Sequence, residues 1–289
     1  MSYYRILGFE QEPFSTSPDP NFFYLTQEHE SALTNLLIEL RLRRGLSVIL
    51  GDVGTGKTSL SRKLVQCLKE RGDFIFHILL DPSFEDESLF LTALARNFEI
   101  GSGNGGEGRP ESGFTVLDLK ESLERFLYQK AVAQHQTVVL VVDEAQKLSE
   151  SSMETLRLLL NFETNENKLL QLVLLGQLEL HAKIMSIPNF CDRVSFRFTL
   201  NPLGFRETKD MIQFRIRQAG YLAAAPLFLD EAIGLIHQVS RGYPRRITLL
   251  CHRALKNLVL RNKWAVDEGM IRELVDEDVK QGWLTQVLH

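Results

Sequence analysis

The segment GDVGTGKT, Gly51 to Thr58, constrains the possible folds of this chain more than any other feature. It fits the phosphate-loop pattern, follows the apolar run LSVIL and precedes a stretch of helical periodicity, which is the strand, loop and helix context that the pattern requires. Glycines let successive backbone N–H groups turn inward around a phosphate, and the following helix N-terminus adds positive partial charge. A glycine-rich turn with an exposed lysine is the alternative, but it leaves this context unexplained. The sequence therefore predicts a phosphate site between a strand and a helix.

The pattern around this loop predicts a parallel sheet with helices on both faces, because short β-rich runs alternate with longer helical stretches. The predicted strands are Leu46–Leu50, Phe74–Leu80, Val138–Val142, Leu172–Leu175 and Val194–Leu200. The predicted helices between and before them are Ser31–Arg43, Lys57–Arg71, Glu87–Phe98, Val116–Gln134 and Ser151–Phe162. The glycine-rich segment 101–113 lacks apolar anchors and is expected to be a flexible surface loop.

After Asn201 and Pro202 the pattern becomes wholly helical. The helices predicted there are Arg206–Ala219, Asp230–Ser240, Arg245–Arg261 and Asp267–Gln281. We therefore predict an α/β nucleotide-binding domain at 1–201, which includes an N-terminal segment at 1–30, and a small all-helical domain at 202–289.

The composition is that of a globular protein. Hydrophobic residues make up 44% and charged residues 24% of the 289. The formal net charge of −4 provides no global positive field, so contact with DNA or an anionic membrane would need a local patch. Three separated cysteines, Cys67, Cys191 and Cys251, predict buried thiols in a reducing compartment. With no secretory leader and no run near ~18 apolar residues, we expect a cytoplasmic chain that does not itself insert into a membrane. A fragment of a longer membrane protein is the alternative.

Residues inside the phosphate loop are predicted to bind MgATP. Lys57 would contact the β- and γ-phosphates, and the hydroxyl of Thr58 would ligate Mg²⁺. The further loop residues predicted to contact the nucleotide are Gly51, Val53, Gly54, Thr55, Gly56 and Ser59. Mg²⁺ is the only metal predicted, because the seven histidines and three cysteines show no metal-ligand spacing. A solvated or core position is expected for each histidine, and His29 is the one to examine.

Two carboxylates follow the apolar strand TVVLVV directly. A buried parallel strand would deliver them to the same sheet edge as the phosphate loop. Asp143 would then hold Mg²⁺ through water, and Glu144 would orient and polarise the attacking water. An exposed acidic turn is the alternative. Gln177, after the strand LQLVLLG, could reach the same water or the γ-phosphate, although a surface glutamine that begins the next helix fits the pattern nearly as well.

Two groups of arginines could supply positive charge to the γ-phosphate, in cis or from a neighbouring subunit. Arg193 precedes the fifth predicted strand, and Arg245 and Arg246 follow a proline at a helix start. Arginines at such positions are usually solvated, so the residue types alone favour neither group.

Together these motifs resemble the AAA+ ATPases. The opening YYRILGFEQEPFSTSPDPNFFYLTQEHESAL and the loop GDVGTGKT are similar to ExeA/GspA-type ATPases of bacterial secretion systems and their pilus-associated relatives, and the resemblance extends over about 3–281. It implies an AAA+ fold with a helical lid, a homo-oligomer in the form of a ring or filament, and a protein partner in a secretion or pilus system.

The resemblance also implies roles for individual residues. Arg193 would be an arginine finger acting in trans, with Arg197 as its rival, and Arg245 would be a sensor arginine in the lid that contacts ATP. Gln177 would be the sensor residue on the fourth strand. Relatives often carry asparagine where this chain has Thr248. Full-length secretion members continue into a membrane span and a cell-wall-binding domain, and we expect neither within residues 1–289.

Three functions remain open at this point. The first is an oligomerising ATPase that couples ATP state to assembly of a secretion or pilus apparatus. The second is a DNA-associated regulator of the transposition target-selection type, whose candidate basic patches are Arg41, Arg43, Arg44, Arg215 and Arg217. The third is a small-molecule kinase, which the adjacent Asp143 and Glu144 disfavour because they indicate water as the nucleophile.

Overall fold

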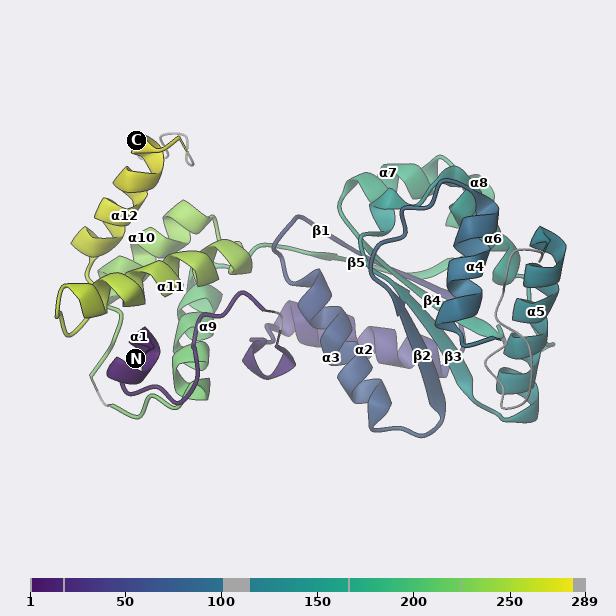
Figure 1. The fold of residues 1–289 in the computed structure, drawn as a ribbon, viewed down its shortest axis with the longest axis horizontal. Coiled ribbons are helices and arrows are strands. Elements are labelled where there is room, and N and C mark those ends of the chain that lie inside the picture. The colour runs from purple at the N-terminus through teal and green to yellow at the C-terminus, as the bar shows by residue number, and fades with distance from the viewer. Residues whose placement is uncertain (1, 18, 101–114, 166, 224, 283–289) are drawn as a thin grey trace. The chain divides into compact units, whose positions relative to one another are not determined.

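The computed structural model describes residues 1–289 except residues 1, 18, 101–114, 166, 224 and 283–289 (Figure 1). The predicted flexible loop at 101–113 lies outside the described residues. By packing, the chain divides into two compact units. The first unit comprises Met1–Thr26, Val53–Ser59 and Asn201–His289, and the second comprises Gln27–Asp52 and Leu60–Leu200.

The second unit is built on a five-stranded parallel sheet in the order β2-β3-β4-β1-β5, which confirms the predicted fold class. The strands are β1 Leu46–Gly51, β2 Phe74–Leu79, β3 Thr137–Val142, β4 Leu170–Gly176 and β5 Val194–Leu200. Every residue of β1, β3 and β4 is buried, which explains why these sequences are continuous apolar runs. The edge strand β5 instead alternates between more and less exposed residues.

Helices cover both faces of this sheet (Figure 1). Residues of α4 Glu87–Asn97, α5 Val116–Tyr128 and α6 Glu150–Leu159 form one core with alternate residues of β1, β3 and β4. On the other face α2 Gln27–Arg41 packs against β3 and β5, and α3 Lys57–Lys69 buries Leu60, Leu64 and Leu68. The remaining short elements are the π-helical turn η2 Gln129–Ala133, the 3-10 turn η3 Ala145–Lys147, α7 Glu179–Met185 and α8 Pro188–Cys191.

The first unit is helical. It contains α1 Tyr3–Ile6, the 3-10 turn η1 Pro20–Phe22, α9 Phe205–Gln218, α10 Asp230–Ser240, α11 Pro244–Leu260 and α12 Glu268–Lys280. Its core includes Phe9, Phe14 and Phe22 from the N-terminal segment together with apolar side chains of α9 to α12. The described residues among 2–26 therefore fold with the C-terminal helices, an arrangement that the local sequence pattern does not indicate.

Arg215 of α9 joins these two parts of the first unit. Its guanidinium donates to the backbone carbonyls of Pro13 and Ser15 at 2.8 Å each and to Thr248 Oγ1 at 3.3 Å. The same group lies 5.9 Å from the ring centroid of Phe14, and only 9% of the residue is exposed. Burial lowers the pKa of Arg215 to about 10. A buried cation that is satisfied by backbone carbonyls fixes the path of residues 13–15.

Candidate functional site

The part of the phosphate loop that lies in the first unit, residues 53–58, contains two glycines in the left-handed backbone region. Gly54 and Gly56 have φ of +87° and +104°, a region that other residues adopt only with strain. The α-helix α3 begins at Lys57, so the loop leads into a helix N-terminus. Thr55 is fully buried, and Lys57, the first residue of α3, is 6% exposed. This cradle is chemically suited to a nucleotide's phosphates.

The start of α11 lies against this loop. The backbone N–H of Arg245 donates to the carbonyl of Gly54 at 3.4 Å, and a methyl group on Gly54 would come within 3.1 Å of Arg245 Cβ. The side chain of Arg245 is exposed, whereas that of Arg246 stacks over the Tyr243 ring at 5.1 Å. Of the two predicted arginines in this helix, Arg245 has its backbone beside the loop.

The paired carboxylates, in the second unit, follow β3 as predicted. Asp143 is 4% exposed, and its backbone N–H donates to the carbonyl of Leu79 at 2.8 Å. Its Oδ1 accepts from the backbone N–H of Glu144 at 2.9 Å. Glu144 has φ of +52°, a left-handed conformation that is uncommon for a residue other than glycine and that directs the chain into η3.

Glu144 and Gln177 are connected through Gln146, a residue that the sequence reasoning did not single out. The Gln146 amide Nε2 donates to Glu144 Oε2 at 2.6 Å, and its Oε1 accepts from the backbone N–H of Gln177 at 3.1 Å. Gln177 follows the last residue of β4, Gly176, where a methyl group would lie 2.5 Å from Leu180. The available signal was the tetrapeptide DEAQ, in which the glutamine follows the second carboxylate by two positions.

The topology gives these strand ends a common edge. Strands β1, β4 and β3 are parallel neighbours in the sheet, and they end at Gly51, Gly176 and Val142. Asp52, Gln177 and Asp143 therefore all follow the carboxyl ends of neighbouring parallel strands, which is where ligands bind in open parallel sheets.

Arg193 is placed elsewhere, between α8 and the start of β5. It is partly buried, and among the described residues its Nε has no hydrogen-bond partner. Two carboxylates are within reach of its charge. The pKa of Glu154 is lowered mainly by Arg157 and that of Glu163 mainly by Lys168, with a smaller contribution from Arg193 to each. Arg197 lies within β5, exposed and paired in register with Val48.

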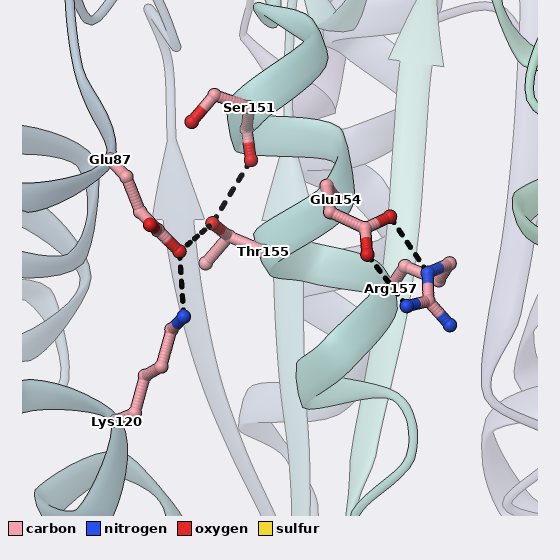
Figure 2. A network of polar contacts seen from close by, with 6 residues as sticks. All are labelled: Glu87, Lys120, Ser151, Glu154, Thr155 and Arg157. Atoms are coloured by element: carbon pink, nitrogen blue, oxygen red, sulfur yellow. Dashed lines mark hydrogen bonds and ion pairs between the residues drawn. The ribbon is translucent and has the colours of Figure 1, made fainter. Parts of the chain in front are cut away.

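A polar network fixes α6, the helix that carries Glu154 (Figure 2). Glu87 of α4 pairs with Lys120 of α5 at 2.8 Å and accepts from the Thr155 hydroxyl at 3.0 Å. Lys120 is the main cause of the lowered pKa of Glu87. Glu154, one residue before Thr155, binds Arg157 through both carboxylate oxygens. Three helices are thereby joined on the side of the sheet that α6 covers.

Among the described residues, no three His, Cys, Asp or Glu side chains gather as a metal site. Mg²⁺ at nucleotide sites needs only one or two protein ligands beside phosphate oxygens and water, and Thr58 and Asp143 are the predicted pair. His29 is buried at 2% exposure. Cys67, Cys191 and Cys251 are free thiols, but only Cys251 is fully buried. No helix in the described ranges has the length and apolar character needed to cross a membrane.

The arginines that were candidates for a DNA-binding patch are not all exposed in the structure. Arg215 is buried and bound to carbonyls, so it is unavailable as a surface cation. Arg43 donates to Thr137 Oγ1 at 3.2 Å and to the carbonyl of His135 at 3.3 Å. Arg41, Arg44 and Arg217 remain exposed.

Comparison with known proteins agrees with this architecture. The chain matches a family described as "AAA domain" over residues 40–184. General secretion pathway protein A of Aeromonas hydrophila is 34% identical over 271 residues, which cover 93% of this chain and 47% of that protein. This identity confirms the resemblance drawn from the opening segment and the phosphate loop. The present chain spans about half the length of that relative.

Solved structures show the same fold at low identity. Cdc6p from Pyrobaculum aerophilum superposes with a TM-score of 0.68 at 18% identity, covering 88% of this chain and 67% of that one. The Aeropyrum pernix ORC1 protein, solved in complex with DNA, gives a TM-score of 0.64 at 16% identity, covering 92% of this chain and 69% of that one.

Proposed function

The chain belongs to the AAA domain family, and from this premise we propose that it is an ATPase that converts ATP and water to ADP and phosphate. The observation that carries the proposal is the phosphate loop, with left-handed Gly54 and Gly56 leading to a buried Lys57 at a helix start. The carboxylates Asp143 and Glu144 at the end of β3 add support, because they follow a strand that ends at the same sheet edge as β1.

Binding is assigned to the loop and to Asp143. Lys57 offsets charge on the β- and γ-phosphates, while the backbone of the loop surrounds them. Thr58 and Asp143 hold Mg²⁺, which neutralises charge on the phosphate oxygens when bound. The other loop residues proposed to contact ATP are Gly51, Val53, Gly54, Thr55, Gly56 and Ser59. Arg245, whose backbone lies against Gly54, is the proposed sensor from the helical unit.

The chemical step is assigned to Glu144, which accepts a proton from the attacking water. Gln177, at the end of β4, is the proposed sensor of the γ-phosphate. Arg193 is the proposed finger for a neighbouring subunit's nucleotide, which makes the active unit a homo-oligomer. The 1–201 and 202–289 division remains our proposal for the functional domains, with the lid in the second of them.

The cellular role that we propose is assembly or remodelling of a bacterial secretion or pilus apparatus, together with a protein partner. The 34% identity to General secretion pathway protein A over nearly the whole chain supports this role. The three free cysteines support the cytoplasmic location that we propose. DNA-associated regulation is the second candidate. The likeness to an ORC1 protein solved with DNA favours it, whereas burial of Arg215 removes one of its candidate contacts.

Two variants test the ATPase assignment. Lys57→Ala should abolish ATP binding measured by calorimetry, because the phosphate charge loses its counterion. Glu144→Gln should bind ATP normally but turn over at least ~100-fold more slowly, since an amide is a poor proton acceptor. Unchanged affinity in the first variant would refute the phosphate site, and near-normal turnover in the second would refute the role of Glu144. Strong salt-sensitive stimulation of turnover by duplex DNA would favour the second candidate function.

A further inference from the structure

The side chain of Gln146 lies between the residue that we assign as base and the end of the neighbouring strand. Its Nε2 is 2.6 Å from Glu144 Oε2, and its Oε1 is 3.1 Å from the backbone nitrogen of Gln177. Glu144 follows β3 and Gln177 follows β4, so this one amide connects the ends of two adjacent strands.

The orientation of the amide follows from its two partners. The backbone nitrogen of Gln177 can only donate, which requires the carbonyl oxygen of Gln146 to face it. The NH₂ group must then face the Glu144 carboxylate, which accepts hydrogen bonds when ionised. The reversed amide would set an oxygen against the carboxylate and two donors against each other.

The surroundings hold Gln146 in this position. The ammonium of Lys183, from α7, donates to the backbone carbonyl of Gln146 at 3.1 Å and also to the carbonyl of Leu148. On the other side, a methyl group on Gly176 would come within 3.3 Å of Gln146 Oε1. The turn η3 and the glycine at the end of β4 therefore leave the amide little freedom.

We propose that Gln146 is a positioning residue for Glu144 and couples the orientation of that carboxylate to the backbone at Gln177. The proposal rests on the ATPase function proposed above. A hydrogen bond to one carboxylate oxygen restricts the side-chain rotation of Glu144 and leaves the other oxygen for water. Because the same amide accepts a hydrogen bond from the Gln177 N–H, a shift of the chain after β4 breaks or reorients the hydrogen bond from Gln146 to Glu144. Nucleotide contact with Gln177 would thus be transmitted to Glu144 without any direct contact between the two.

Three full-length variants separate this role from a structural one. Gln146→Met removes both hydrogen bonds at similar side-chain length. Gln146→Glu keeps an oxygen for the Gln177 N–H but replaces the donor to Glu144 by a second carboxylate. Gln134→Ala is the matched control, an exposed glutamine whose side chain accepts from Lys130 one turn earlier and from no other described residue. Steady-state ATP turnover, ATP affinity by calorimetry and the thermal unfolding midpoint are measured for each variant.

The expected result is a fall in kcat of about 10- to 100-fold for both Gln146 variants, since small misplacement of a reacting group costs rates of this order. ATP affinity should stay within about twofold of the wild-type value, and Gln134→Ala should match wild type. In a Glu144→Gln background, Gln146→Met should lower kcat no further, because residues that act as a unit are not additive.

Other results for these variants would contradict the positioning role of Gln146 or the role of Glu144. Normal turnover in Gln146→Glu with loss only in Gln146→Met would show that Gln146 merely supports the backbone at Gln177. Multiplicative loss in the double variant would show that Gln146 does not act through Glu144. Loss of ATP affinity or of thermal stability in proportion to kcat would likewise refute a positioning role. Full activity of Glu144→Gln would refute the role of Glu144 on which this proposal rests, and unchanged ATP affinity of Lys57→Ala would refute the proposed ATPase function itself.

Discussion

Arg193 and Gly51 lie at opposite ends of the strands of the central sheet, Arg193 where β5 begins and Gly51 where β1 ends. Val194, the residue after Arg193, pairs with Leu46 at the start of β1, whereas Gly51 pairs with Leu200 at its end. At a rise of about 3.3 Å per residue, the length of β1 separates these two ends of the strands by roughly 17 Å. Because Arg193 precedes the start of β5 and Gly51 ends β1, the arginine-finger role that we propose for Arg193 is one toward another subunit.

Arg193→Ala should therefore bind ATP normally and hydrolyse it poorly, with a loss of ~10³-fold or more. Mixing it with Lys57→Ala should restore part of the activity, because a mixed interface joins an intact phosphate loop to an intact finger. Turnover per subunit measured against protein concentration checks the same dependence on assembly. No recovery despite demonstrated co-assembly would rule out the trans mechanism.

Arg197→Ala is the control for this experiment. Arg197 is exposed within β5, four positions after Arg193, which precedes that strand, so the two arginines lie at different heights along the sheet. It should retain turnover and respond to concentration as wild type does. If Arg197→Ala loses activity and Arg193→Ala does not, the finger has been assigned to the wrong arginine.

Arg215→Ala should destabilise the first unit by about 3–5 kcal/mol, because three acceptors lose a buried donor and a cavity remains. The acceptors are the carbonyls of Pro13 and Ser15 and the hydroxyl of Thr248. Arg217→Ala is the matched control on the same helix, since its exposed side chain donates to the Gln213 carbonyl one turn earlier and to no other residue in the described part of the chain. It should cost under ~0.5 kcal/mol. Equal denaturant midpoints for the two variants would contradict a clamp at Arg215.

Arg215 shows which parts of the fold the sequence can predict and which it cannot. The strands and the long helices were found because burial follows a period of two or 3.6 and leaves a local pattern. Arg215 lies on the buried side of α9 with Met211 and Ile212, so the helical period was informative there. Its charge nevertheless suggested a surface patch, because the carbonyls that satisfy it come from residues about 200 positions earlier.

In the candidate site, too, contiguous motifs can be predicted from the sequence, whereas contacts between distant residues cannot. The phosphate loop and the paired carboxylates are contiguous motifs, so their residue types and context could be read along the chain. The connection from Gln146 to Gln177 spans 31 positions and exists only once β3 and β4 are adjacent. The helices α7 and α8, with seven and four residues, are too short to establish a periodicity.

His77 of β2 should make the second unit less stable in mild acid. Its ring packs edge-on against Phe98 at 4.5 Å, and its Nε2 is buried without a hydrogen-bond partner among the described residues. Burial lowers its pKa below the ordinary 6.5, with smaller opposing effects from Asn97 and Glu99. Below about pH 6.5 the unfolded chain therefore binds a proton that the folded chain does not. The free energy of unfolding consequently decreases as the pH is lowered.

The check is urea unfolding at pH 7.5 and pH 5.5. His77→Phe removes the titrating group, so it should lose less stability between these pH values than wild type does. His181→Phe, at an exposed histidine, is the control and should follow wild type. A pH dependence that His77→Phe leaves unchanged would assign the effect to other groups.

Gly242→Ala should be among the most destabilising single substitutions in the first unit. Gly242 has φ of +74°, and a methyl group there would lie 2.1 Å from the carbonyl oxygen of Leu203, while its own carbonyl accepts from the Leu203 N–H at 2.8 Å. Gly8→Ala is the matched control: its φ of +84° carries the same left-handed penalty, about 1–2 kcal/mol, but nothing lies within 4 Å of the added methyl. Gly242→Ala has to move a backbone segment as well, so we expect a loss of about 3 kcal/mol or more. Chemical unfolding of both variants measures the difference, and equal losses would mean that the clash with Leu203 is relieved at no cost and that backbone conformation alone selects glycine at position 242.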